Sequence, residues 1–148
     1  MKTIATNKKA RFEYELLESY EAGIVLHGPE IKSARDSKVS LQESYAALEG
    51  GEVFLHNMFI APYEPANRYN EEPTRKRKLL LRKSEIKRLA GKMSGSGLTI
   101  VPTKAYLKNG RAKVEIALAR GKKKYDKREA IKKRELDREA RRSFRGGT

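Results

Sequence analysis

The chain has 148 residues, with 34 Lys or Arg against 19 Asp or Glu, so its net charge at pH 7 is +15. It contains no cysteine, which excludes disulfide frameworks, thiolate zinc sites and cysteine nucleophiles and fits a reducing cytoplasm. The N-terminus lacks the apolar run of a signal peptide, and aliphatic runs such as residues 24–26 and 79–81 are far too short to span a bilayer. We expect a cytoplasmic protein with no membrane segment, whose partner is a polyanion.

The first part of the chain predicts two short strands. Apolar and polar residues alternate over residues 12–16, and residues 24–26 form a second apolar segment. The intervening residues 21–23 contain Gly23 and interrupt this pattern. We therefore predict a strand, a turn and a second strand, with a short helical turn afterwards at residues 30–35.

Two glycine-containing turns predict two further hairpins. Gly50 and Gly51 separate apolar residues 45–48 from residues 53–60, and both glycines can take a positive φ. Asn109 and Gly110 separate residues 98–107 from residues 112–119, where apolar residues fall on one face. Asn-Gly between alternating segments is the strongest short-range hairpin signal.

One longer helix is predicted between the second and third hairpins. Apolar residues at positions 86, 89, 90 and 93 have the spacing of one helical face. Ser84 is the expected N-terminal cap, and Gly95 and Gly97 are expected to end the helix.

Six short strands in antiparallel pairs, with one to three short helices, predict a mainly β fold. A small closed antiparallel barrel is the preferred architecture, because closure removes exposed strand edges. A half-open sandwich is the structural alternative. We expect one domain over residues 1–119 and a basic tail over residues 120–148.

Basic residues cluster outside the tail as well. Residues 61–74 hold three of the five prolines and predict a surface loop, and six basic residues follow within residues 75–83. These could simply flank an edge strand and add solubility. They could also share a face with the clusters at residues 8–11 and 32–35 and bind phosphate. The aromatic residues that could stack on bases, or equally pack in the core or at its rim, are Tyr14, Tyr20, Phe59, Tyr63 and Tyr69.

Enzymatic residue patterns are missing from the sequence. The only histidines, His27 and His56, both fall in predicted strands without a surrounding catalytic pattern. There is no Walker or Rossmann glycine spacing and no acidic cluster with metal-ligand spacing. We predict that the protein is not an enzyme and needs no metal or other cofactor.

The tail carries more than half of the net charge in a fifth of the chain. Residues 120–148 hold thirteen Lys or Arg against five Asp or Glu, with almost no core-forming residues. Such a segment is expected to be disordered when free. Acidic residues nevertheless precede basic ones by three or four positions, as in Glu129 and Lys133 or Asp137 and Arg141, which favours a helix once a partner is bound. A plain solubility tail is the alternative.

Several ordered motifs together resemble one family. They lie at residues 7–11, 20–26, 28–35, 75–81 and 121–128, so the resemblance covers nearly the whole chain. The family is small protein B (SmpB), the bacterial tmRNA-binding or SsrA-binding proteins that rescue stalled ribosomes. The competing interpretation is a structural or assembly-associated ribosomal or other RNA-binding protein, which would also be small, basic and tailed.

The resemblance implies a barrel of oligonucleotide-binding (OB) type that holds the tRNA-like domain of tmRNA without catalysis. It also implies that alanyl-tmRNA is delivered to the ribosome together with elongation factor Tu and GTP. Glu21 could accept hydrogen bonds from a base or hold a neighbouring Arg, although it could also be a turn residue, and Leu80 could be a core residue. The RNA-binding residues expected from the resemblance and the basic clusters are Asn7, Lys8, Lys9, Arg11, Glu21, Lys32, Arg35, Arg75, Arg77, Lys78 and Leu80.

For the tail, the resemblance implies a helix in the empty mRNA channel near the decoding centre, in contact with 16S rRNA. Many relatives carry His where this chain has Tyr125. The Tyr ring can still stack on a base, but it cannot supply a protonated imidazole. The expected ribosome-binding residues are Gly121, Lys122, Lys123, Tyr125, Asp126, Lys127, Arg128, Lys132, Lys133 and Arg134.

Overall fold

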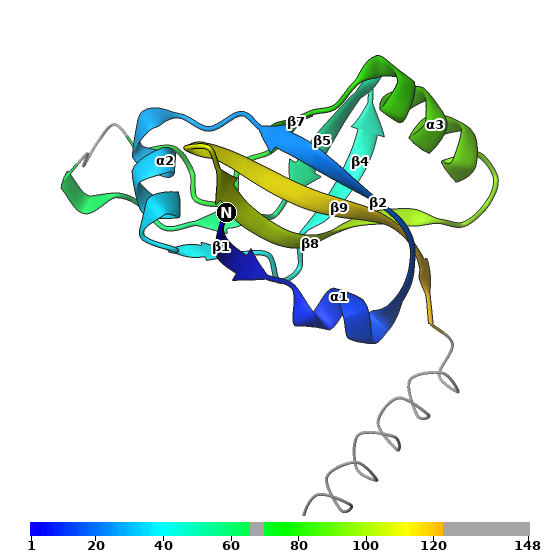
Figure 1. Cartoon of the computed structure of the whole chain (residues 1–148), viewed down its shortest axis with the longest axis horizontal. Coiled ribbons are helices and arrows are strands. Elements are labelled where there is room, and N and C mark those ends of the chain that lie inside the picture. The colour runs from blue at the N-terminus through cyan, green and yellow to red at the C-terminus, as the bar shows by residue number, and fades with distance from the viewer. Residues whose placement is uncertain (66–69, 123–148) are drawn as a thin grey trace, which may run out of the picture.

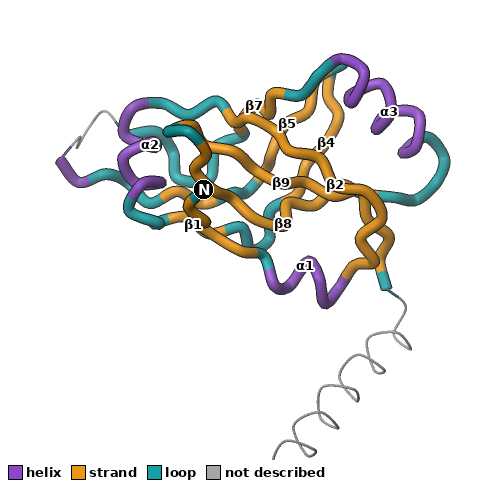
Figure 2. Tube along the Cα trace, viewed as in Figure 1, coloured by secondary structure: helices purple, strands orange, loops and turns teal. Residues whose placement is uncertain are grey.

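The computed structural model describes residues 1–65 and 70–122, which form an antiparallel sheet with three short helices around it (Figure 1). The helices lie at three separate places around the strands (Figure 2). In chain order the elements are β1 (Lys2–Thr6), α1 (Lys8–Glu13), β2 (Tyr14–Ile24), α2 (Gly28–Arg35), β3 (Val39–Ser40), β4 (Tyr45–Glu49), β5 (Glu52–His56), β6 (Phe59–Ile60), β7 (Arg77–Leu80), α3 (Lys83–Met93), β8 (Thr99–Lys108) and β9 (Arg111–Gly121).

Hydrogen bonding in the main sheet runs in a ring. The strand order is β1-β8-β4-β5-β7-β2-β9, and β8 also pairs with β9, so the path from β8 through β4, β5, β7, β2 and β9 returns to β8. All of these pairings are antiparallel. β1 extends the sheet beside β8, and β3 and β6 form a separate two-stranded sheet. The predicted mainly antiparallel β fold with short helices is confirmed.

The second and third predicted hairpins are confirmed. Gly50 and Gly51 join β4 to β5 with φ values of 57° and 79°. Asn109 and Gly110 join β8 to β9 with φ values of 52° and 75°. Positive φ at both central residues gives the turn a twist that matches the flanking strands, which explains why these two dipeptides identified the hairpins.

The first predicted hairpin is wrong. Residues 14–24 form one continuous strand, β2, that pairs with β9 along its length and with β7 at its end. Gly23 lies within this strand and opposite Leu80, where an added Cβ atom would lie 3.3 Å from the Leu80 Cβ atom. The glycine therefore permits close approach of β7 rather than a turn.

Three local expectations also need correction. His27 lies at the N-terminal cap of α2 rather than in a strand, whereas His56 lies in a strand as predicted, at the end of β5. The N-terminal cap of α3 is Arg82 instead of Ser84, and the Arg82 amide donates to the Glu85 carboxylate at 3.0 Å. Residues 8–13 form helix α1, so the predicted strand at residues 12–16 begins only at residue 14.

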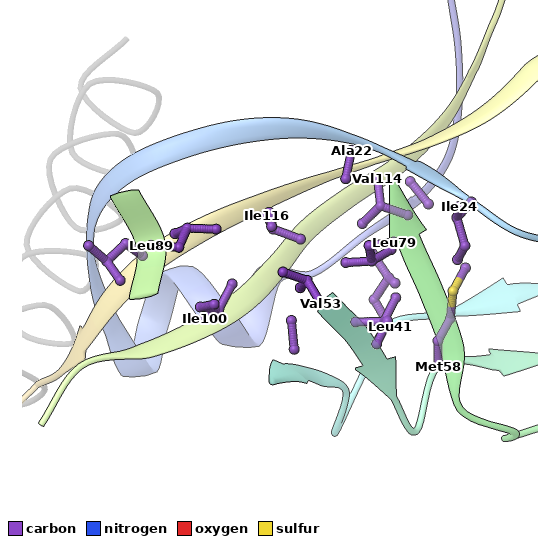
Figure 3. Close-up of a cluster of buried hydrophobic side chains, with 14 of the residues drawn as sticks. Ala22, Ile24, Leu41, Val53, Met58, Leu79, Leu89, Ile100, Val114 and Ile116 are labelled. Carbon is purple, nitrogen blue, oxygen red and sulfur yellow. The ribbon is translucent and has the colours of Figure 1, made fainter. Parts of the chain in front are cut away.

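The core lies inside the ring of strands and beneath α3. Figure 3 shows Leu89 of α3 beside side chains from β8 and β9, among them Ile100 and Ile116. Leu79 of β7 is also fully buried there. Each fully buried Leu or Ile contributes about 1.5–3 kcal/mol, so this cluster binds the strands and α3 together.

Two connecting features complete the body. The described residues between β6 and β7 contain no strand, consistent with the predicted loop, while residues 66–69 lie outside the described part. Among the helices in residues 1–65 and 70–122, none is long and apolar enough to cross a membrane.

Candidate nucleic-acid interface

Asn7 begins helix α1 and fastens it to the sheet. Its side-chain oxygen Oδ1 accepts the Ala10 amide at 3.2 Å, and its side-chain nitrogen donates to the carbonyl oxygens of Pro102 at 2.9 Å and Leu41 at 3.4 Å. Asn7 is only 4% exposed. An amide with this many internal partners acts as a helix cap and a cross-link between segments.

The cations of α1 surround this buried cap. Lys8, Lys9 and Arg11 are all exposed. Lys9 pairs with Glu43, and this hydrogen bond raises the pKa of the Lys9 ammonium. The three predicted side chains are therefore held on one short helix, with Asn7 beneath them as its support.

A buried carboxylate organises the cations near α2. One Glu30 oxygen accepts the Arg75 Nη2 at 2.6 Å and the His27 amide at 2.9 Å. Its other oxygen accepts the Arg75 Nε at 3.1 Å and the Arg77 Nε at 2.8 Å. Burial alone would raise the pKa of Glu30, but the hydrogen bonds from Arg75, the His27 amide and Arg77 outweigh it and lower the pKa. Glu30 is thus ionised in the folded protein and joins α2 to β7.

Arg77 is fully buried within this cluster, at 0% exposure. Besides Glu30, its guanidinium donates to the carbonyl oxygens of Met58 at 2.5 Å and Pro73 at 3.0 Å, and to that of Arg75 at 3.3 Å. These bonds occupy the donors of the guanidinium. In this conformation Arg77 has no donor left for a ligand at the surface.

Glu30 is a residue that the sequence interpretation missed. It lies three positions after the helix cap His27 and accepts the His27 amide, which is the pattern of a capping box. That spacing was a usable signal for the start of α2. The pairing with Arg75 and Arg77, 45 and 47 residues later, had no local signal.

Two exposed cations lie on α2 itself. Lys32 is exposed, with its Nζ atom 5.3 Å from the centre of the Tyr63 ring. Arg35 is also exposed, and its backbone carbonyl accepts the Lys2 ammonium at 2.8 Å. The ammonium and guanidinium groups of Lys32 and Arg35 are therefore accessible to an anionic ligand.

Glu21 and Leu80 meet on the face formed by β2 and β7. Glu21 accepts the Tyr106 hydroxyl at 2.5 Å and lies 3.4 Å from the Lys108 ammonium, and the Tyr106 hydrogen bond lowers the pKa of the Glu21 carboxyl. Leu80 is 52% exposed, so it is a surface residue rather than a core residue. Both line one groove of about 560 Å³ together with Lys113.

The structure distributes the predicted residues over three places. Asn7, Lys8, Lys9 and Arg11 belong to the cap and helix of α1. Lys32 and Arg35 lie on α2, whose Glu30 binds Arg75 and Arg77. Glu21, Lys78 and Leu80 lie on β2 and β7, where Lys78 pairs with Glu52 at 3.3 Å. Asn7 and Arg77 are buried, and the others reach the surface at least in part.

The start of the predicted tail is attached to the body. Gly121 ends β9 opposite Tyr14. The Lys122 amide donates to the Glu13 carbonyl at 2.8 Å, and the Lys122 ammonium donates to the Arg11 carbonyl at 3.2 Å. The predicted tail residues that lie outside the described residues are Lys123, Tyr125, Asp126, Lys127, Arg128, Lys132, Lys133 and Arg134.

The histidines and acidic residues make structural contacts. His56 stacks on Tyr45, with ring centres 5.0 Å apart, and contacts Glu49 at 2.9 Å. His27 contacts Glu71 at 2.5 Å. Within residues 1–65 and 70–122, no three His, Cys, Asp or Glu residues are grouped so that they could hold a metal ion.

Comparison with known proteins gives one consistent result. The family model described as "SmpB protein" matches residues 4–146. A protein of Persephonella marina named "SsrA-binding protein" is 55% identical over 146 residues, covering 99% of this chain and 96% of its own. A protein of the same name from Geobacillus thermodenitrificans is 58% identical over 144 residues, covering 97% and 93%.

A solved structure also matches. It is described as "tmRNA-SmpB: a journey to the center of the bacterial ribosome", with a TM-score of 0.68 and 51% sequence identity, and covers 85% of this chain and 92% of its own. The fold and the family model therefore agree over most of the chain. This chain belongs to the SmpB protein family.

Proposed function

We propose that the chain binds tmRNA, also called SsrA RNA, and acts in trans-translation on stalled ribosomes. The observation that carries this proposal is identity of 55–58% over nearly the whole length of proteins named for SsrA binding. The excess of exposed cations supports it, because phosphate neutralisation supplies much of the affinity for RNA. The protein acts by binding, without catalysis or a cofactor.

The body would hold the tRNA-like domain of tmRNA through two kinds of residue. Lys8, Lys9 and Arg11 on α1, and Lys32 and Arg35 on α2, are exposed and suited to phosphate contacts. On the face formed by β2 and β7, Glu21 offers a hydrogen-bond acceptor, Lys78 offers positive charge and Leu80 offers apolar area.

Asn7 and Arg77 would support RNA binding from within. Both side chains are buried and make several internal hydrogen bonds. We assign them to positioning α1 and α2, respectively. Arg75 is partly exposed, so it would both position α2 and contact RNA.

The ring of strands is proposed to be a barrel of OB type. Its closure through the β8–β9 pairing and the exposed residues on β2 and β7 support this assignment. OB-type barrels commonly bind nucleic acid through strand faces and adjoining loops.

The tail would enter the empty mRNA channel near the decoding centre and form a helix there. Its spaced acidic and basic residues support this role, as does attachment of Lys122 to α1 at the point where the tail begins. The partners are then tmRNA, the ribosome with its 16S rRNA, and elongation factor Tu with GTP through alanyl-tmRNA. These partners imply a cytoplasmic location.

Deleting residues 123–148, which keeps the end of β9 and the Lys122 contacts with α1, tests the division between body and tail. The truncated body should bind an SsrA RNA transcript nearly as well as the full chain, while peptide tagging on stalled ribosomes is lost. Affinity is measured by filter binding and tagging in a reconstituted translation reaction. Equal loss of both would contradict the division.

Crosslinking in cells tests the choice of partner. SsrA RNA should be recovered above rRNA and tRNA when bound RNA is sequenced. A structural ribosomal protein would instead remain with translating ribosomes in stoichiometric amounts after a high-salt wash.

A further inference from the structure

Helix α3 has cations on two of its sides, and the two sides differ in their ion pairs. Arg88 and Lys92 both contact Glu18 of β2, at 2.8 Å and 2.5 Å. Lys83 and Lys87 are exposed and, within residues 1–65 and 70–122, make no ion pair or side-chain hydrogen bond. One side of α3 is thus bound to the sheet by charge, and the other presents two free ammonium groups.

The two free lysines border a groove between β7 and α3. The groove has a volume of about 570 Å³, and its lining residues are Gly51, Glu52, Lys78, Leu79, Leu80, Leu81, Lys83, Ile86, Lys87 and Ala90. The single carboxylate among them, on Glu52, pairs with Lys78 at 3.3 Å. The charges of Lys83 and Lys87 therefore remain uncompensated over a largely apolar floor.

Leu80 connects this groove with the candidate RNA-binding face. Leu80 is 52% exposed and lines both this groove and the neighbouring one that contains Glu21. A strand bound at Glu21 could therefore continue past Leu80 towards α3. Glu85 lines the groove that contains Glu21, where its carboxylate accepts the Arg82 amide at 3.0 Å. In the groove between β7 and α3, the one lining carboxylate is the paired Glu52.

On the basis of the proposed function, we propose that the groove between β7 and α3 binds a further stretch of the same RNA. Phosphates of this stretch contact Lys83 and Lys87, and the apolar faces of its sugars and bases lie over Leu80. The arrangement suits RNA because a phosphate chain matches separated ammonium groups while unstacked bases cover apolar surface. Lys83 and Lys87 are then RNA-binding residues in addition to those on β2 and β7.

A pair of double variants on the same helix tests this proposal. K83Q/K87Q removes the two free charges, and R88Q/K92Q removes the same net charge from the side that faces Glu18. Affinity of the full chain for an SsrA RNA transcript is measured over a range of salt concentrations. For K83Q/K87Q the slope of log affinity against log salt should fall by about 1.4–1.8, because each phosphate contact contributes about 0.7–0.9. The slope for R88Q/K92Q should stay close to that of the unmodified chain.

Crosslinking gives a second readout that does not depend on charge. A photoreactive amino acid at position 87 should crosslink to the RNA in the complex, and one at position 92 should not. Thermal unfolding of both double variants shows whether the fold is retained, since all four side chains are exposed.

Three other outcomes would contradict the proposal that RNA binds in the groove between β7 and α3. Equal slope changes in the two variants would reveal a general charge effect, and an unchanged slope for K83Q/K87Q with no crosslink at position 87 would exclude RNA there. Unchanged RNA affinity with reduced tagging would mean that an acidic protein occupies the groove instead. Failure of the unmodified chain to bind SsrA RNA would instead overturn the proposed function itself.

Discussion

Glu30 and Glu18 each hold two cations, but they do so in different surroundings. Glu30 binds Arg75 and Arg77 between α2 and β7, and the exposed fractions of the Glu30 and Arg77 side chains are 5% and 0%. Glu18 binds Arg88 and Lys92 between β2 and α3, where the exposed fractions of the Arg88 and Lys92 side chains are 58% and 40%. Each cluster thus combines one carboxylate with two cations. The cluster at α2 is buried, whereas the cations of the cluster at α3 are exposed to solvent.

The difference separates structural charge from charge available to a partner. In the buried cluster, removing one ion leaves the others without compensation, so the cluster is indispensable to its helix. In the solvated cluster, water and salt replace a lost partner. We therefore expect α2 to depend on Glu30 for its position, and α3 to be held mainly by its apolar face, including Leu89.

The largest expected effect comes from Glu30→Gln. The change leaves Arg77 buried without its carboxylate, so the free energy of unfolding should fall by about 3–5 kcal/mol. Urea unfolding followed by circular dichroism measures this loss. Glu18→Gln is the matched control and should move the urea midpoint far less; similar midpoints for the two variants would show that burial makes no difference.

Arg77→Lys should have a smaller effect. The ammonium keeps the charge beside Glu30 but cannot reproduce the hydrogen bonds to both Met58 and Pro73. Leaving a buried carbonyl unpaired costs about 1–3 kcal/mol, which urea unfolding would detect. Stability equal to that of the unmodified chain would mean that charge alone matters in this cluster.

Acid unfolding in concentrated salt should distinguish the two carboxylates further. The pKa of Glu30 is below its usual value of 4.5, so its contribution to stability is present above that pH and is lost as the pH falls through the lower, folded pKa. Glu18 also has a lowered pKa, caused first by the Arg88 hydrogen bond, but its side chain is half-buried and both of its cationic partners are exposed.

In about 1 M salt the screening length is about 3 Å, so the Glu18 contribution should largely disappear while that of Glu30 persists. Stability profiles from pH 2 to pH 7 for the unmodified chain, Glu30→Gln and Glu18→Gln provide the comparison. If Glu30→Gln retains the full acid dependence at high salt, another carboxylate must be responsible.

The smallest expected effect is on RNA affinity. Glu18→Gln frees Arg88 and Lys92 and raises the net charge by one, so affinity for an SsrA RNA transcript at low salt should rise about twofold or less. Titration at low and moderate salt measures this change. A fall in affinity would instead show that the Glu18 cluster orients α3 for RNA binding.

Local sequence signals predicted the parts of the fold that local energetics controls. The Asn109-Gly110 and Gly50-Gly51 turns depend on backbone conformations that these residues favour themselves. The apolar face of α3 depends on spacing within eleven residues. The same local reasoning wrongly predicted a turn at Gly23. The role of this glycine depends on Leu80, which is more than fifty residues away in sequence.

The candidate site divides in the same way. Exposed cations such as Lys8, Lys32 and Arg35 were found from composition and family motifs. Neither source indicated that Arg77 is buried or that Glu30 holds it. The sequence also did not indicate that Lys83 and Lys87 are unpaired, because this depends on which acidic residues the fold brings near α3.

The sequence by itself determined the family, the excess of positive charge, two of the three predicted hairpins and the amphipathic helix α3. Motifs, charge and short-range spacing are properties of neighbouring residues and can be read without a fold. Only the tertiary structure decided which charges are buried and paired and which remain free. That outcome depends on contacts between distant segments, where burial in low dielectric makes one ion pair essential and solvent leaves another nearly dispensable.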